Sequence, residues 1–419
     1  MTGRELDIVL FGATGFVGAL TAAHLAREAG PDVRVALAGR SRARLESVRA
    51  GLGASTDGWE LVEVDATDAS GLRKLAARTT VLASTVGPYA VHGREVVRAC
   101  AEAGTAYADL TGEVLFVRWS LDEVDARARE TGARIVHACG FDSIPSDLGV
   151  LLLARRAAAD GEGTLGETTL RVRSLRGGLS GGTIDSGRQQ AIAARADPSA
   201  RAVLADPYGL SPRRAEEPPS GREGPTGVRG RLRTRLPVER DPRTGRWSGP
   251  FLMASFNTRI VRLSNTLSGW SYGRGLRYRE ATDFGSSPVS PLLAAGMAIG
   301  LGGVLTGLSI RPTRAVLDRV LPRPGQGPDA ATRAAGRFRM EIETTTTSGA
   351  RYLARVGADY DPGYDGTAVM LGQSALCLAR DGAATPARAG VLTPATAMGE
   401  PLVARLRAQG FTFEVSRTA

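Results

Sequence analysis

The sequence DIVLFGATGFVG, residues 7–18, decides the fold of this chain. Its first five residues form a short apolar run of strand length, and residues 19–28 carry apolar side chains on one side of a predicted helix. Residues 33–38 (VRVALA) then predict a second strand. A strand, a glycine-rich turn, a helix and a second strand within about thirty residues form the context in which such a turn binds a dinucleotide.

Each glycine of this turn has its own physical role in that context. Gly12 permits a tight turn, Gly15 lets the backbone approach a pyrophosphate, and Gly18 allows the helix to pack closely on the sheet. The start of the helix presents free N–H groups and the positive end of its dipole to the phosphates. A bare structural turn is the alternative interpretation. The predicted cofactor-binding residues of the turn are Gly12, Ala13, Thr14, Gly15, Phe16, Val17 and Gly18.

The end of the second strand predicts which nicotinamide cofactor binds. An acidic residue there would accept a hydrogen bond from the ribose 2′-hydroxyl and favour NAD. The chain instead has Gly39, Arg40, Ser41 and Arg42, with no carboxylate. Because a guanidinium can pair with a 2′-phosphate and stack on the adenine, Arg40 and Ser41 are predicted to bind NADP, and NAD is the less favoured cofactor. The alternative is that Arg40 only starts the next helix in solvent.

Strands and helices continue to alternate as far as residue 138. The expected strands are 59–64, 80–86, 106–110 and 134–138, and the expected helices are 69–78, 92–103 and 122–131. This alternation is typical of a doubly wound parallel sheet, which binds ligands beyond the carboxyl ends of its strands. Asp65, Val86, Gly87 and Pro88 follow strand ends and are therefore predicted to lie near the cofactor. Asp65 would serve equally well as a helix N-cap.

The composition limits the classes of protein that remain. The chain has 419 residues, which suggests two or three domains, and its 42% hydrophobic and 23% charged residues are ordinary for a soluble globular protein. Three cysteines and three histidines are scattered, which argues against a disulfide framework or a metal site and suggests a reducing cytoplasmic compartment. Aromatic residues make up only 5%, and no groove-reading motif accompanies the net charge of +10, so nucleic acid is not an expected partner.

The second half of the chain predicts mixed helices and strands. The glycine-rich run 177–183 (GGLSGGT) precedes an expected helix at 184–196, whose first N–H groups could hold an anion or an enolate oxygen. A glycine-rich surface turn is the alternative. Residues 336–359 alternate like a β-hairpin, and 365–378 and 400–408 are expected helices.

Two segments of this half have an unusual composition. Residues 206–250 are rich in Pro, Gly and Arg, with ten arginines against five acidic residues between Arg213 and Arg246. We expect a solvated, mobile excursion with one strand at 229–236, or a basic surface for an acidic carrier protein or a coenzyme A phosphate. Residues 284–310 contain no charged residue. They predict a buried helix pair, a wall of an apolar substrate cavity, or a peripheral contact with lipid, whereas a spanning helix would separate two parts of one enzyme.

Several motifs together resemble the saccharopine dehydrogenase-like family. They are GATGFVG (12–18), AGR (38–40), VGPY (86–89), YADLTGE (107–113) and GFDSIPSD (140–147). Within that family the chain looks most like the trans-acting enoyl reductases of actinobacterial polyketide-lipid assembly, and SGGT (180–183) and the tail 393–413 are similar to the same group.

The resemblance implies an α/β fold: an N-terminal Rossmann domain with a doubly wound parallel sheet, and a second α+β substrate domain. We expect the Rossmann domain to be discontinuous, with residues 1–147 joined by about 385–419. Residues 148–384 would then form the substrate domain, including the basic loop 206–250 and the apolar segment 284–310.

The resemblance also implies an NADPH-dependent oxidoreductase that reduces a C=C bond of an acyl or polyketide thioester in lipid biosynthesis. Four residues near strand ends are the predicted catalytic residues: Tyr89, His92, Asp142 and Ser143. Tyr89 is the first candidate to donate to an enolate, or else packs beneath the nicotinamide, and His92 is a second acid candidate or a polar surface residue. Asp142 and Ser143 could contact the nicotinamide amide or the substrate, or form a turn and a helix cap.

Two other functions stay open at this stage. One is reduction of a C=N or C=O bond, as in true saccharopine reductases, and the other is an NADP-binding protein at a lipid surface without turnover. The expected partners are a small-molecule or carrier-bound acyl substrate, an acidic carrier protein, and a second copy in a homodimer. Peripheral contact through residues 284–310 with the inner face of the plasma membrane is also expected, and no metal is.

Overall fold

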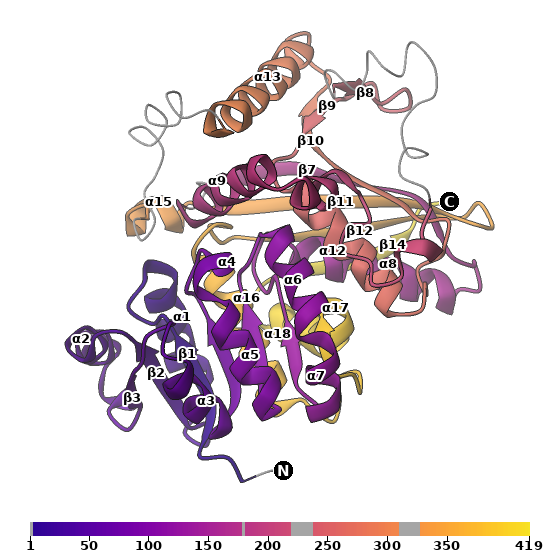
Figure 1. The fold of residues 1–419 in the computed structure, drawn as a ribbon. Helices are drawn as coiled ribbons and strands as arrows, with labels where there is room; N and C mark the ends of the chain where they lie inside the picture. The colour runs from indigo at the N-terminus through magenta and orange to yellow at the C-terminus, as the bar shows by residue number, and fades with distance from the viewer. Residues whose placement is uncertain (1–2, 178–180, 219–237, 310–326) are drawn as a thin grey trace.

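The computed structural model describes residues 3–177, 181–218, 238–309 and 327–419, which form two β-sheets, one in each half of the molecule (Figure 1). The first sheet has seven parallel strands in the order β13-β6-β5-β4-β1-β2-β3. Its strands are β1 (Leu6–Phe11), β2 (Val35–Gly39), β3 (Glu60–Glu63), β4 (Thr79–Ser84), β5 (Ala106–Asp109), β6 (Arg134–Val136) and β13 (Gly390–Leu392).

Helices cover both faces of this sheet, because the side chains of β1 alternate between two apolar clusters. Ile8 and Leu10 lie in the cluster with α1 (Phe16–Glu28) and α16 (Asp365–Arg380). Val9 and Phe11 lie in the other cluster, with α3 (Ala69–Ala77) and α5 (Arg94–Ala103). The two helices of each face pack against each other. The predicted doubly wound α/β sheet is confirmed.

The second sheet is mixed and has the order β14-β12-β11-β7-β10-β9-β8. Only β7 and β10 pair in parallel, and the other neighbours are antiparallel. Its strands are β7 (Leu165–Arg176), β8 (Glu239–Arg240), β9 (Trp247–Pro250), β10 (Arg277–Gly285), β11 (Arg337–Thr346), β12 (Arg351–Ala358) and β14 (Thr412–Arg417). The predicted hairpin of residues 336–359 is the pair β11–β12.

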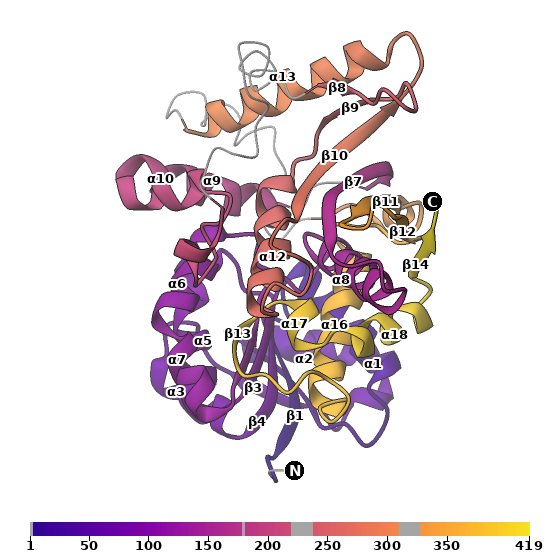
Figure 2. The same ribbon diagram turned by 90° about the vertical axis from the view of Figure 1, so that its right-hand side faces the viewer.

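Helix α8 (Ile144–Ala159) connects the two halves and lies against the second sheet (Figure 2). Leu148 is fully buried in the cluster that includes residues of both sheets. Gly149 lets this helix approach β11, since a Cβ there would lie 2.4 Å from Cδ1 of Ile342. The core is therefore continuous from one sheet to the other, and it fixes the second sheet above the carboxyl ends of the first.

Further helices complete the fold. They are α2 (Arg42–Leu52), α4 (Tyr89–His92), α6 (Val114–Glu123), α7 (Asp125–Thr131), α9 (Gly181–Ala196), α10 (Pro198–Ala205), α12 (Ala254–Leu267), α13 (Ser290–Ser309), α15 (Ala330–Ala334), α17 (Pro394–Ala397) and α18 (Glu400–Ala408). Within the described ranges, no helix is long and apolar enough to cross a membrane.

The structure differs from the sequence expectations at several elements. A helix after Arg40 was only the alternative interpretation there, and the structure has α2 at these positions. The segment expected as a loop at 206–250 contains β8 and β9. The strand expected at 229–236 lies outside the described residues. The tail returns to both sheets, since β13 pairs with β6 and β14 pairs with β12. A discontinuous Rossmann domain with a boundary near residue 385 stays a prediction.

Candidate functional site

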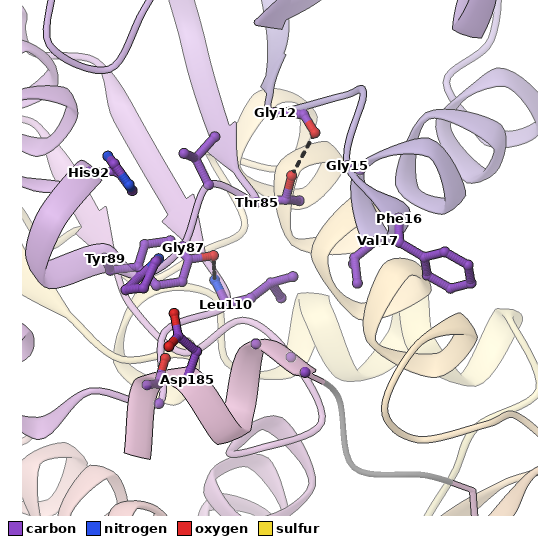
Figure 3. Close-up of a pocket in the computed structure, with 18 of the residues that line it drawn as sticks. Gly12, Gly15, Phe16, Val17, Thr85, Gly87, Tyr89, His92, Leu110 and Asp185 are labelled. Carbon is purple, nitrogen blue, oxygen red and sulfur yellow. Dashed lines mark hydrogen bonds between the residues drawn. The ribbon is translucent and has the colours of Figure 1, made fainter. Parts of the chain in front are cut away.

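A cavity of about 840 Å³ lies at the carboxyl ends of the first sheet, between that sheet and the second half of the molecule. Most of the residues predicted to act line it (Figure 3). These are Gly12, Thr14, Gly15, Phe16, Val17, Gly18, Arg40, Asp65, Val86, Gly87, Pro88, Tyr89, His92 and Asp142. The other three predicted residues, Ala13, Ser41 and Ser143, do not line the cavity.

The glycine turn has the geometry that a bound pyrophosphate needs. Gly12 has φ +89°, and Gly18 allows α1 to pack against the turn, since a Cβ on Gly18 would lie 2.1 Å from the Gly12 carbonyl oxygen. Gly15 is the N-cap of α1, and among the described residues no side chain caps the helix there. The uncapped N-terminus therefore leaves its N–H groups and dipole facing the cavity, which suits an anionic group.

The ribose end of the cavity carries two arginines. Arg40 is exposed, with its Nε 3.9 Å from Oδ2 of Asp65, and Arg44 on α2 also lines the cavity. Arg44 is a residue that the sequence reasoning missed. Ser41 instead caps α2, because its side chain accepts a hydrogen bond from the Arg44 N–H at 3.4 Å. Two guanidinium groups at this end suit the 2′-phosphate of NADP.

Asp65 forms a local turn and is not a helix N-cap. Its Oδ1 accepts hydrogen bonds from the N–H and the hydroxyl of Thr67, at 2.8 and 2.6 Å, and these bonds lower its pKa. Asp68 is the residue that caps α3, through the N–H of Gly71. His92 lines the same cavity on the side of Gly87 and Tyr89 (Figure 3).

Tyr89 is held in place by the backbone around it. Its buried hydroxyl donates to the Ser84 carbonyl at 3.1 Å and accepts from the Leu110 N–H at 3.2 Å. Burial raises the pKa of this hydroxyl well above its usual value. Both hydrogen-bonding roles of the hydroxyl are therefore used to join the ends of β4 and β5.

Asp142 is the predicted catalytic residue with the most unusual environment. It follows β6, is partly exposed to the cavity, and receives no hydrogen bond from the part of the chain that the structure describes. Burial raises the pKa of its carboxyl to about 7. Its neighbour Ser143 is fully buried and donates to Oδ1 of Asn257 at 3.2 Å. Asp142 therefore presents to the cavity a carboxyl that is partly protonated near neutral pH.

The opposite wall of the cavity comes from the second half of the chain. Gly181 and Gly182 begin α9 and line the cavity with Asp185, which lies across it from Gly12 and Gly15 (Figure 3). Asp185 forms an ion pair with Arg188. Apolar lining comes from Leu252, Met253 and Phe256, at and just before the start of α12. The cavity thus has an anion-binding turn on one side and an apolar wall on the other.

Glu113 joins the two walls and was not predicted as a site residue. It is fully buried, and its two carboxylate oxygens accept from the N–H groups of Tyr89 and Ala90, each at 2.8 Å. The hydroxyl of Ser186 on α9 donates to the same carboxylate at 2.8 Å. Gln190, one turn further along α9, accepts from the Val114 N–H at 2.7 Å. Glu113 is therefore a positioning residue that connects the loop after β4 to α9.

We expect Glu113→Gln to loosen this connection. The NH₂ group of the Gln side chain would face a backbone N–H, and both groups are hydrogen-bond donors. One buried donor would then be unpaired, which lowers the stability of the fold by about 1–3 kcal/mol. Thermal unfolding of the variant should begin at lower temperature, and the Kd for NADPH should rise several-fold. Ser186→Ala is the matched control: it removes only the α9 contact, so NADPH affinity should stay within about twofold. Unchanged unfolding and binding in Glu113→Gln would contradict this role.

A buried Ser–His–Asp arrangement lies outside the cavity. Nδ1 of His137 is 2.8 Å from Oδ2 of Asp109, and its Nε2 is 2.9 Å from the hydroxyl of Ser120. All three side chains are almost completely buried, and none lines the cavity. Asp109 also accepts from the Thr111 and Ala138 N–H groups, each at 3.1 Å. The arrangement therefore joins β5, β6 and α6 and gives no substrate access to the serine.

Comparison with known proteins agrees with this geometry. Residues 8–136 match the family model of the saccharopine dehydrogenase NADP binding domain. A trans-acting enoyl reductase of Mycobacterium tuberculosis is 46% identical over 418 residues, 99% of this chain and 98% of that protein. One from Mycobacterium ulcerans is 46% identical over 421 residues, with the same coverage. A second Mycobacterium tuberculosis protein, provisionally given the same name, is 50% identical over 422 residues, 100% of this chain and 99% of that protein.

Two solved structures share the fold along most of the chain. Saccharopine dehydrogenase (L-Glu forming) from Saccharomyces cerevisiae has a TM-score of 0.53 at 13% identity, covering 98% of this chain and 99% of that one. Homospermidine synthase from Legionella pneumophila has a TM-score of 0.50 at 12% identity, covering 100% and 93%. With the full-length identity to the mycobacterial proteins, these matches show that the chain belongs to the trans-acting enoyl reductases, a group of saccharopine dehydrogenase-like, NAD(P)-dependent oxidoreductases.

Proposed function

We propose that the protein reduces the C=C bond of an α,β-unsaturated acyl thioester with NADPH. The observation that carries the proposal is the cavity itself, which is lined by the glycine turn, by Asp142 and by the apolar side chains Leu252, Met253 and Phe256. When bound along the glycine turn, NADPH would supply a hydride to the β-carbon of the substrate. The chain must then hold the substrate, stabilise the enolate and deliver one proton.

Asp142 is the proposed proton donor. After hydride addition the electrons of the C=C bond move to the thioester oxygen, which becomes an enolate. Collapse of the enolate takes the proton from the Asp142 carboxyl to the α-carbon, and solvent then reprotonates the carboxylate. Gly181 and Gly182 at the start of α9 line the same cavity. The Gly181 N–H already donates to the Tyr364 hydroxyl, so the Gly182 N–H is the proposed stabiliser of the enolate oxygen.

The contacts favour Asp142 over the other predicted catalytic residues. The Tyr89 hydroxyl is already engaged with Ser84 and Leu110, so we assign Tyr89 to the support of the loop after β4. The Ser143 hydroxyl is directed at Asn257, and His92 sits at the end of the short helix α4 that Tyr89 begins. We propose these three as supporting residues.

The charges of the cavity favour an acyl chain as substrate. A substrate with several carboxylates, such as an amino-acid imine, would need cationic partners beside the reacting carbon. Arg40 and Arg44 are the arginines among the described lining residues, and both lie at the ribose end. Leu252, Met253 and Phe256 instead offer an apolar wall. Reduction of a C=N bond is therefore the less favoured reaction.

The protein also needs a source of its acyl substrate and a location in the cell. We propose a role in lipid biosynthesis, with the acyl chain presented by an acidic carrier protein to this basic chain of net charge +10. We also propose that the protein forms a homodimer and contacts the inner face of the plasma membrane.

The reaction and the cofactor preference can be tested in one experiment. Purified protein is titrated with NADPH and NADH, and absorbance of the reduced nicotinamide is followed with unsaturated acyl thioesters. We expect NADPH to bind more tightly and to be oxidised only when a thioester is present. Binding without oxidation across the panel would contradict the substrate class and leave the cofactor assignment intact.

Arg40→Asp tests which residue selects NADPH. Loss of one charge-assisted bond to a 2′-phosphate costs about 1.5–3 kcal/mol, so NADPH affinity should fall roughly 10- to 100-fold while NADH affinity changes little. Arg42→Asp is the matched control, because Arg42 does not line the cavity and its guanidinium instead contacts Glu46 at 3.1 Å and the Leu61 carbonyl at 2.9 Å. Equal losses in the two variants would contradict a specific role for Arg40.

A further inference from the structure

The helix α13 exposes an apolar surface at one end of the molecule. Both ribbon views place α13 beyond the β8–β10 ribbon, at the end of the molecule away from the first sheet (Figures 1 and 2). Leu292 is 73% exposed and Ile299 is 65% exposed. The α13 surface comprises five exposed large side chains: Val289, Leu292, Leu293, Met297 and Ile299. This is most of the exposed large apolar side chains among the described residues, so the patch is a concentrated one.

One side of α13 is attached to the rest of the protein and the other is not covered by the described chain. Ala294 is fully buried, and its backbone lies close to Gly249 of β9, where an added Cβ would be 3.2 Å from the Ala294 carbonyl oxygen. The helix also packs on α9. Since no residue from 284 to 310 is charged, covering the outer side would remove no charged side chain from water.

We propose that the α13 surface binds the outer layer of an anionic phospholipid bilayer. At 100° per residue, the exposed side chains from Ile299 to Met297 spread over roughly 160° of the helix. The seam through which two helices pack as a pair is narrower than this arc, so two α13 helices packed against each other would leave part of it in water. A lipid surface covers the whole arc. The net charge of +10 attracts the chain to anionic lipid before the apolar side chains enter it.

Helix α9 connects the α13 surface to the cavity. Helix α9 packs directly on α13, while its first residues and Ser186 line the cavity. Binding through α13 would therefore keep the substrate wall close to the lipid surface. The inference rests on the proposed location and not on the proposed reaction, because it concerns a surface outside the cavity.

Vesicle binding tests the inference without NADPH or thioester. The full chain is mixed with vesicles of phosphatidylglycerol and phosphatidylcholine, or of phosphatidylcholine alone, and floated through a density gradient. We expect flotation with the anionic vesicles, decreasing with added salt, and at least tenfold weaker binding for the triple variant Leu292→Ser/Leu293→Ser/Ile299→Ser. Val91→Ser is the matched control, since Val91 is 60% exposed on α4, a helix that lies apart from α13 (Figure 1), and this variant should bind like the original chain.

A fluorescent probe gives an independent measurement. The three cysteines of the chain are buried, so a thiol-reactive, polarity-sensitive dye would label Leu292→Cys or Val91→Cys selectively. The emission of the dye at position 292 should shift to the blue with anionic vesicles, and the dye at position 91 should not respond. Absence of flotation, or binding that the triple variant retains, would overturn the inference. A mass that falls from dimer to monomer in the triple variant, with no vesicle binding in the original chain, would assign the surface to a second copy.

Discussion

Asp142→Asn should lower kcat for thioester-dependent NADPH oxidation by roughly 10²- to 10⁴-fold, the range typical of a lost general acid. The amide has nearly the same shape as the carboxyl but cannot deliver its proton to the enolate. Asp142 receives no hydrogen bond from the described chain, so the substitution breaks none there. The Kd for NADPH should stay within about threefold. Stopped-flow absorbance of the reduced nicotinamide and a binding titration measure the two quantities separately.

The pH dependence gives a second readout of the same residue. Burial raises the pKa of Asp142 to about 7, so the acid form that the reaction needs is present below pH 7 and is lost as the pH rises through 7. The logarithm of kcat should therefore fall above pH 7 in the original chain, and the small residual rate of Asp142→Asn should not show this step. Asp142→Glu keeps a carboxyl and should recover part of the rate. A kcat within threefold in Asp142→Asn would contradict the assignment, and the proton would then come from another donor.

Stability must be followed over the same pH range. Asp147 and Glu280 are also buried carboxyls whose pKa is raised to about 7. Between pH 4 and 7 the folded chain holds protons on these groups that the unfolded chain releases, so stability decreases as the pH rises through this range. Thermal unfolding measured beside kcat separates this effect from loss of the catalytic acid, because both variants at position 142 keep Asp147 and Glu280.

The parts of the fold that follow local patterns could be predicted from the sequence. The run 7–18 combines an apolar strand, glycines at fixed offsets and a helix start, and the structure has β1, the turn and α1 at those positions. Helix α2 could be given only as an alternative interpretation at Arg40, because its one buried residue is Leu45 and the polar side chains around it give no apolar stripe. Helix α12 was missed because its buried face includes Asn257 and Arg262, whose partners lie on other elements.

Much of the candidate site depends on residues that are distant in the sequence. Glu113 accepts from Tyr89, Ala90 and Ser186, and no spacing rule links these positions. A carboxylate shortly after a strand end was the available signal, within the motif YADLTGE. Asp142 could be placed near the cavity from its position after β6, but its raised pKa follows from its burial in the folded chain. Folding, and not spacing, determines that property.

The second large effect is expected at the glycine turn, where Gly18→Ala and Gly15→Ala should both weaken NADPH binding, for different reasons. A Cβ on Gly18 would lie 2.1 Å from the Gly12 carbonyl oxygen and 2.9 Å from its carbon, and backbone atoms cannot rotate away. Helix α1 must then shift, which lowers the free energy of unfolding by about 1–3 kcal/mol or more. We expect unfolding several degrees lower and NADPH affinity reduced more than tenfold, as measured by calorimetry and titration.

Gly15→Ala should separate binding from folding. Gly15 has φ −77°, which any residue can adopt, and the contact that its Cβ would make is 3.3 Å from the Gly12 carbonyl oxygen. The methyl group would therefore disturb the fold little but would occupy the path of the pyrophosphate. We expect an unchanged unfolding temperature with NADPH affinity at least tenfold lower.

Gly51→Ala is the control for both glycine variants, because its Cβ would meet nothing within 4 Å in α2. It should stabilise the helix by about 0.5–1 kcal/mol and leave NADPH binding unchanged. Unaltered unfolding in Gly18→Ala would contradict the close packing of α1 on the turn. Unaltered affinity in Gly15→Ala would contradict the position of the pyrophosphate, and with it the direction in which the cofactor crosses the cavity toward Asp142. Gly18→Ala therefore tests the packing of α1 on the turn, and Gly15→Ala tests the binding of the pyrophosphate by the turn.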